Sequence, residues 1–192
     1  MHPITTSRLI IRQYQAGDIT EQADAVTESV ETVGQWLPWC TKAYSITDAA
    51  EWFVLCEKCI KFSQSFDLGV FDKHSNALIG SIAINEVDKQ NRRGNIGYWI
   101  RQSQQNKGYA TEAVKAIIPF GFHILDLIRL ELFAAIENVA SNTVAEKAGA
   151  RFEGVAKNRI FLRGIAHDAN VYSFTPEMNI PQQKATRKNL IG

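Results

Sequence analysis

The stretch that decides the fold runs from IGYWI at residues 96–100 through QNKGYA at residues 105–110 to TEAV at residues 111–114. This pattern predicts a strand, a turn centred on Gly108 and the first turn of a helix. The first N–H groups of a helix lack helical partners and lie at the positive end of its dipole. Such a junction binds phosphate or pyrophosphate, and Gly108 permits close approach because it has no Cβ atom. Lys107 adds a positive charge beside it.

Two familiar phosphate-binding loops do not fit this stretch. The dinucleotide-binding fingerprint needs three glycines, and the Walker loop ends in Gly-Lys-Ser or Gly-Lys-Thr. The loop QNKGYA contains a single glycine, Gly108, and the Walker ending is absent. What remains is the pattern Gln105-x-x-Gly108-x-Ala110, which by itself is a weak signal because glycine is common in turns.

The composition is that of an ordinary globular protein. The chain has 192 residues, of which 45% are hydrophobic and 21% charged. We therefore expect a single domain at residues 1–176 and a polar C-terminal tail at residues 177–192. The net charge of +1 gives no reason to expect nucleic-acid binding. No apolar run is long enough to span a membrane and the N-terminus lacks the apolar core of a signal peptide, so we expect a cytoplasmic protein without membrane contact.

The cysteines give no sign of a disulfide framework or a metal site. Cys56 and Cys59 form a C-x-x-C pattern, and Cys40 stands apart from them. The pair lies within a helical pattern, and no second pair of cysteines or histidines supplies the other ligands of a zinc ion. We expect buried, reduced thiols and no metal.

The rest of the chain alternates strand and helix patterns. Strands are expected at residues 9–12, 66–71, 78–85, 94–100 and 129–136, with two more within residues 152–174. Helices are expected at residues 18–29, from Asp48 with Glu51 as its capping-box partner, at residues 109–125 with an interruption at Pro119, and from Asn138 to Gly149. These elements predict an α+β domain with a central, mostly antiparallel mixed sheet.

Several motifs in the same order along the chain resemble the GNAT superfamily of acyl-CoA-dependent N-acetyltransferases. They are SRLIIR at residues 7–12, LPW at 37–39, IGS at 79–81, NIGYWI at 95–100, the Q-x-x-G-x-A loop, NVASN at 138–142, EKAG at 146–149, Glu153-Gly154, Asp168 and Tyr172. The resemblance runs from Thr6 to Phe174 and is greatest to the branch of ribosomal-protein N-terminal acetyltransferases. It implies the GNAT fold, with helices on both faces of the sheet. One departure is Ala150, where the family usually has an aromatic residue, and Phe152 is a candidate to fill that space.

The resemblance implies acetyl-CoA as cosubstrate and assigns residues to it. The residues implied for the CoA pyrophosphate are Gln105, Asn106, Lys107, Gly108, Tyr109, Ala110 and Thr111. Tyr98, Trp99 and Ile100 would offer free backbone groups to the pantetheine arm, and one N–H there would stabilise the oxyanion. Asn138 would hydrogen-bond the pantetheine amide. Ser141 would protonate the leaving thiolate or position a water that does so; the alternative is that Asn138 and Ser141 only begin a helix.

The catalytic base has two candidates. Direct transfer requires a neutral amine, and an α-amine has a pKa near 8 where a lysine amine has one near 10.4. A modest carboxylate working through water is therefore enough for an α-amine. Glu86 and Asp88 follow a strand, and alternation places them on one face while that strand persists. The competing interpretation is that they are solvated charges beside a turn.

Trp36 and Trp39 are candidates to line the acceptor pocket, with closure of the core as the alternative role. The leading hypothesis is acetyl transfer to a protein N-terminal α-amine of the ribosomal-protein type. The alternatives are acetylation of a small-molecule amine and a non-catalytic acyl-CoA-binding module. Family analogy also allows a homodimer.

Overall fold

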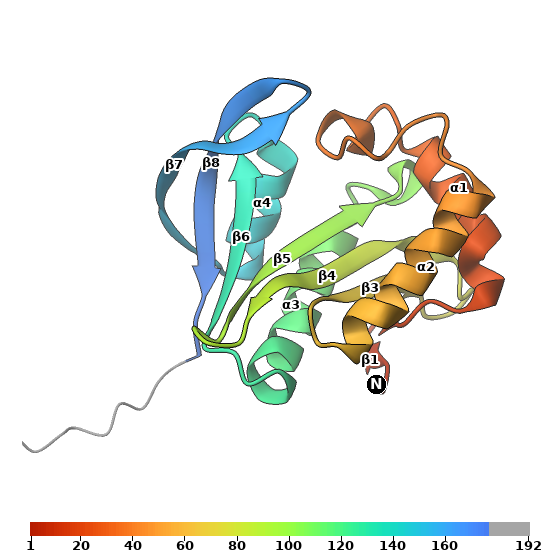
Figure 1. Cartoon of the computed structure of the whole chain (residues 1–192), viewed down its shortest axis with the longest axis horizontal. Coiled ribbons are helices and arrows are strands. Elements are labelled where there is room, and N and C mark those ends of the chain that lie inside the picture. Colours follow the sequence, from red (N-terminus) through yellow and green to blue (C-terminus); the bar gives the residue numbers. More distant parts are fainter. Residues whose placement is uncertain (177–192) are drawn as a thin grey trace, which may run out of the picture.

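A computed structural model describes residues 1–176, which form an eight-stranded sheet with helices packed against it (Figure 1). The predicted tail at residues 177–192 lies outside the described residues. The strands are β1 (Ile4–Thr5), β2 (Leu9–Arg12), β3 (Phe66–Asp72), β4 (Leu78–Asp88), β5 (Arg93–Ile100), β6 (Arg129–Ala135), β7 (Arg151–Leu162) and β8 (Ile165–Phe174). Their order is β1-β2-β3-β4-β5-β6-β8-β7, and among these pairs only β5 and β6 are parallel. The predicted mixed, mostly antiparallel sheet is confirmed.

Four α-helices cover the sheet: α1 (Ile19–Glu28), α2 (Ile46–Lys61), α3 (Tyr109–Pro119) and α4 (Val139–Ala148). Helix α1 packs on α2 and β4, while α3 packs on β4, β5 and α4 (Figure 1). Strands β3 and β4 are buried on both faces, which explains their nearly continuous apolar runs. In β5, for example, Ile96 belongs to the core beneath α3, and Trp99 belongs to a second core beside α1.

Helix α2 begins earlier than its sequence predicts. Ser45 is the N-cap, and its Oγ accepts a hydrogen bond from the Asp48 N–H at 3.2 Å. The Asp48 carboxylate accepts in return from the Ser45 N–H at 2.8 Å. The predicted start at Asp48, with Glu51 as partner, is therefore wrong: Asp48 is the third residue of a capping box that Ser45 opens.

Other helix ends agree with the sequence. The regular part of α3 ends at Pro119, and a π-helical turn (Phe120–Ile124) follows it. Helix α4 is capped at its start by Asn138 and ends at Gly149, whose φ of 90° is left-handed. Both ends of α4 are thus fixed by residue types suited to those positions.

Candidate active site

The central feature of the site is the divergence of β5 from β6. These parallel strands pair only from Arg93 opposite Arg129 to Asn95 opposite Glu131. Strand β5 continues to Ile100, paired on its other edge with β4. Figure 1 shows the two ribbons separating beyond the paired end. The facing backbone edges are therefore without strand partners from Ile96 onward, and such groups need a ligand or water.

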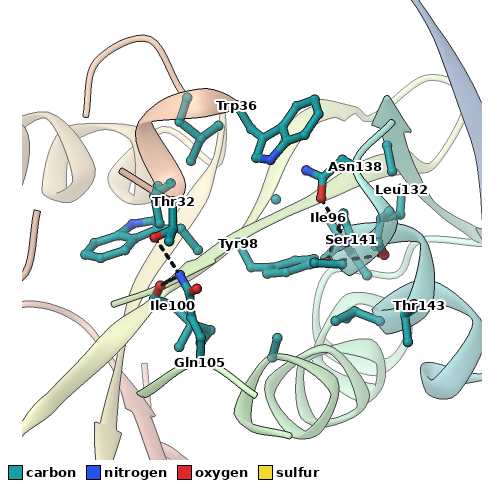
Figure 2. Close-up of a pocket in the computed structure, with 18 of the residues that line it drawn as sticks. Thr32, Trp36, Ile96, Tyr98, Ile100, Gln105, Leu132, Asn138, Ser141 and Thr143 are labelled. Atoms are coloured by element: carbon teal, nitrogen blue, oxygen red, sulfur yellow. Dashed lines mark hydrogen bonds between the residues drawn. The ribbon is translucent and has the colours of Figure 1, made fainter. Parts of the chain in front are cut away.

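A cleft of about 820 Å³ occupies the space between the diverging strands (Figure 2). Its volume lies in the range typical of ligand sites in proteins. Apolar side chains such as Ile96 and Leu132 form part of its wall. Of the residues that border it, only Lys147 carries a charge at neutral pH; none of the bordering residues in the described part of the chain is Asp, Glu or His.

The start of α3 borders this cleft. Gly108 precedes the helix with a φ of 79°, and Asn106 also has a positive φ, of 61°. No side chain caps this end of the helix. Within the described residues, no protein group accepts a hydrogen bond from the N–H of Asn106, Lys107 or Gly108. The loop thus has the free donors that an anion requires.

The structure brings most of the predicted loop residues to the cleft. Those that border it are Gln105, Asn106, Gly108, Tyr109, Ala110 and Thr111. Lys107 is the exception, since its ammonium group donates to the Ser103 carbonyl and to Gln104 Oε1, each at 2.9 Å. Its side chain is therefore folded back along the loop.

Gln105 attaches the loop to the segment after α1. Its Nε2 donates to the Ile100 carbonyl at 2.9 Å and to Thr32 Oγ1 at 3.0 Å (Figure 2). The predicted strand residues Tyr98, Trp99 and Ile100 all border the cleft. The Trp99 side chain is buried in the core beside α1, so what this residue offers to the cleft is its backbone.

Three predicted residues meet at the start of α4. Asn138 Oδ1 accepts a hydrogen bond from the Ser141 N–H at 3.0 Å, and the Ser141 Oγ lies 3.0 Å from the hydroxyl of Tyr98 (Figure 2). Burial raises the pKa of Tyr98 to about 12, although the hydrogen bond with Ser141 opposes that shift. Tyr98 is consequently protonated at neutral pH. The sequence placed Tyr98 and Ser141 on separate elements and gave no signal that their hydroxyls meet.

The alternation expected for Glu86 and Asp88 does not hold. The β4–β5 register shifts between Asn85 and Asp88, and Glu86 has a φ of 50°. Neither carboxylate borders the cleft. The Glu86 side chain is 70% exposed and lies 3.9 Å from Arg159. A bulge of this kind re-aims side chains, so a strict period of two fails here.

Asp88 closes the turn between β4 and β5. Its carboxylate accepts hydrogen bonds from the Asn91 N–H at 2.9 Å and from Asn91 Nδ2 at 2.7 Å, and Arg93 lies 3.3 Å away. The hydrogen bonds from Asn91, with a smaller contribution from Arg93, lower the pKa of Asp88 to about 2. This carboxylate is already occupied as an acceptor.

A second, smaller cavity of about 280 Å³ adjoins the cleft. The two share Asn95 and Phe133, and Glu86 borders only the smaller one. Asn95 Nδ2 donates to Asn85 Oδ1 at 2.8 Å, while its own Oδ1 is buried without a partner in the described structure. Asn95 therefore lies between the neighbourhood of Glu86 and the cleft, with a polar side chain that borders both.

The two tryptophans predicted to line the acceptor pocket lie differently. Trp36 borders the cleft (Figure 2), whereas Trp39 does not. The Trp39 ring is 43% exposed and packs edge-on against Trp99, with ring centroids 5.8 Å apart. From the β7–β8 turn, Arg163 donates to the Gly34 carbonyl and so connects that turn to the Trp36 segment. This contact was not predictable from the sequence, because the two residues are far apart in the chain.

The described residues contain no group of three or more His, Cys, Asp and Glu side chains arranged to hold a metal ion. Cys40 and Cys56 are buried free thiols, and burial raises the pKa of each. Across residues 1–176 no helix has the length and apolarity needed to cross a bilayer.

Comparison with known proteins identifies the family. The acetyltransferase (GNAT) domain matches residues 8–151, which is more than half of the chain. A candidate ribosomal N-acetyltransferase of Bacillus subtilis (strain 168) is 28% identical over 170 residues, covering 86% of this chain and 90% of that protein. The spermidine N(1)-acetyltransferase of Escherichia coli (strain K12) is 26% identical over 116 residues, covering 56% of this chain and 62% of that protein.

Solved structures agree with this result. A candidate ribosomal-protein-serine acetyltransferase from Vibrio cholerae superposes with a TM-score of 0.80 at 32% identity, covering 91% of this chain and 98% of that one. RimL, a ribosomal L7/L12 α-N-protein acetyltransferase solved with coenzyme A, superposes with a TM-score of 0.83 at 22% identity, with the same coverage of 91% and 98%, and shows the shared fold.

The fold and the family match together define the class: the chain belongs to the GNAT acetyltransferase family. It is an N-acetyltransferase. The predicted family and fold class are confirmed, and with them acetyl-CoA as the cosubstrate.

Proposed function

We propose that this chain transfers the acetyl group of acetyl-CoA directly to the α-amine of a protein N-terminus, of the ribosomal-protein type. The observation that carries the proposal is the cleft between the diverging strands β5 and β6, which ends at the uncapped start of α3. The names of the Bacillus and Vibrio relatives and of RimL support a ribosomal-protein acceptor.

The residues of this cleft fit acetyl-CoA. The free N–H groups near Gly108 suit the pyrophosphate, with Gln105, Asn106, Lys107, Tyr109, Ala110 and Thr111 completing the loop. Around Tyr98, Trp99 and Ile100 the edge of β5 that faces away from β4 has no strand partner, and it suits the amides of the pantetheine arm; on this edge the Ile100 carbonyl already accepts from Gln105. Asn138 adds its side-chain amide, since its Oδ1 is engaged with Ser141 and its Nδ2 is left to donate.

Ser141 and Tyr98 are the proposed proton donors to the leaving sulfur. Their hydroxyls lie 3.0 Å apart at the edge of the cleft. Ser141 gives a proton to the departing thiolate while Tyr98 gives one to Ser141, and Tyr98 is replenished from solvent. A serine alone is a poor acid, and coupling to a protonated tyrosine supplies a stronger one.

Glu86 is the proposed proton acceptor, working through water in the smaller cavity that meets the cleft at Asn95. Asp88 was the other predicted carboxylate, but its hydrogen bonds from Asn91 favour Glu86. Deprotonating a lysine amine at neutral pH costs about 3.5 kcal/mol more than deprotonating an α-amine. A cleft bordered by no carboxylate or histidine among the described residues thus favours the more acidic α-amine.

The small-molecule alternative has one observation in its favour, the similarity to a spermidine N(1)-acetyltransferase. The test is release of free CoA from acetyl-CoA with three acceptors: a peptide with a free N-terminus and no lysine, a peptide with a blocked N-terminus and one lysine, and spermidine. We expect the first to give the highest kcat/KM. A higher kcat/KM with spermidine would replace the protein acceptor by a polyamine.

A further inference from the structure

The segment before β2 contacts the outer side of the loop at the start of α3. Arg8 does not border the cleft, yet its Nη1 donates to the Lys107 carbonyl at 2.9 Å. Its guanidinium carbon lies 4.5 Å from the centroid of the Tyr109 ring. The two segments are 99 residues apart in the chain. Arg8 therefore contacts the loop without bordering the cleft.

This contact determines the direction of a backbone N–H. The Lys107 carbonyl and the Gly108 N–H belong to one planar trans peptide, so they point in opposite directions. Because the carbonyl is bound to Arg8, the Gly108 N–H points away from Arg8. Of the two residues that this peptide joins, Gly108 is the one that borders the cleft. Glycine permits rotation of such a peptide at low cost, so the orientation needs an external anchor.

Glu112, on the first turn of α3, holds Arg8 in place. The Glu112 Oε2 accepts from Arg8 Nε at 2.7 Å and lies 2.6 Å from Arg8 Nη2. The Glu112 Oε1 accepts from the Thr6 hydroxyl at 2.5 Å and from the Arg8 N–H at 3.2 Å. Two guanidinium nitrogens thus share Glu112 Oε2, and these charge-assisted contacts hold the guanidinium in place.

We propose that Arg8 is a positioning residue for acetyl-CoA, because it locks the Lys107–Gly108 peptide with its N–H toward the pyrophosphate. The inference rests on the proposed function of the cleft and adds a residue that does not border the cleft. The guanidinium acts through the peptide plane, so its charge alone is not sufficient. A lysine at this position keeps the charge but cannot bridge the Lys107 carbonyl and Glu112 in the same geometry.

The test compares two acetyl donors, acetyl-CoA and S-acetylpantetheine, which lacks the pyrophosphate. For Arg8→Met and Arg8→Lys we expect KM for acetyl-CoA to rise about tenfold, the size of one charge-assisted hydrogen bond. We expect kcat at saturation, and kcat/KM for S-acetylpantetheine, to change by no more than about twofold. Glu112→Gln should also raise KM for acetyl-CoA and leave kcat/KM for S-acetylpantetheine unchanged. This variant keeps the test possible if the Arg8 variants fold poorly.

Arg92→Met is the matched control. Arg92 is 45% exposed where Arg8 is 44% exposed, and it too bonds both a carboxylate and a backbone carbonyl, those of Asp126. Arg92→Met should leave KM for acetyl-CoA and kcat/KM for S-acetylpantetheine unchanged. The proposal would be overturned if the Arg8 variants lost kcat/KM equally with both donors, or lost it with neither. A wild-type KM for acetyl-CoA in Arg8→Lys would also overturn it. Failure of the proposed function looks different, because the wild-type protein would then release no thiol from either donor with the N-terminal peptide as acceptor.

Discussion

The hydrogen bond between Tyr98 and Ser141 offers the sharpest test of the proposed proton transfer. Tyr98→Phe removes one hydroxyl from a 3.0 Å contact and leaves the ring and the strand backbone in place. Loss of such a bond costs about 1 kcal/mol of unfolding free energy. For a chain of this size, that corresponds to a fall in Tm of about 2–4 °C. Because the backbone that faces the pantetheine arm is unchanged, KM for acetyl-CoA should change by no more than about twofold.

The expected effect on turnover is much larger than the effect on stability. Without Tyr98, Ser141 must give its proton unaided, and loss of a positioned acid lowers kcat about 100-fold. The assay is thiol release from acetyl-CoA at saturation of both substrates, beside a thermal melt of the same variant. Burial raises the pKa of Tyr98 to about 12, so the wild-type hydroxyl stays protonated throughout the neutral range.

Tyr172→Phe provides a control for the loss of a buried hydroxyl. Tyr172 lies in β8, is 2% exposed and donates to Asn142 Oδ1 at 3.0 Å. It does not border the cleft. Its variant should lose a similar amount of stability and keep its kcat. If Tyr98→Phe also keeps kcat within about twofold, the hydroxyl pair is structural and the reasoning about proton transfer fails.

Three further predictions concern other parts of the chain. Glu86→Gln should lower kcat/KM for the α-amine while Asp88→Asn should not, as measured by pH profiles of initial rate; a loss only in Asp88→Asn reverses the assignment. Gly108→Ala should cost about 1 kcal/mol of stability and raise KM for acetyl-CoA, since φ at this position is 79°. Hydrogen bonds, first from Arg129, lower the pKa of Glu153 to about 2, so its stabilisation is present above pH 4.5 and lost on acidification toward pH 2. Glu153→Gln should remove that acid-dependent part, at most about 1 kcal/mol for this partly exposed pair, in urea unfolding at several pH values.

Features set by local chemistry were predictable from the sequence. The glycine turn at Gly108, the cap at Asn138 and the end of the regular helix at Pro119 each depend on residues within a few positions. The start of α2 was predicted wrongly because Ser45 and Asp48 are both good caps, and local preference does not rank them. Such signals do not say what the loop binds; that expectation came from the resemblance to the GNAT superfamily.

Features set by register were not predictable. The bulge after Asn85 turns Glu86 away from the face that alternation assigns to it, and no residue type marks that bulge. The meeting of Tyr98 with Ser141 requires the separation of two strands and the placement of a helix beside them. Trp39 was grouped with Trp36 by proximity in sequence, but the intervening turn sends its ring onto Trp99.

The loop that begins α3 is attached to the end of α1 and to the segment that follows it. Glu28 at the end of α1 accepts from the side chain of Arg101 and from the Ser103 N–H at 2.7 Å, and Gln105 reaches Thr32 at 3.0 Å. The same segment carries Trp36. A shift of this loop must therefore strain the contacts that hold the Trp36 segment, which links the proposed pyrophosphate loop to the proposed acceptor side of the cleft.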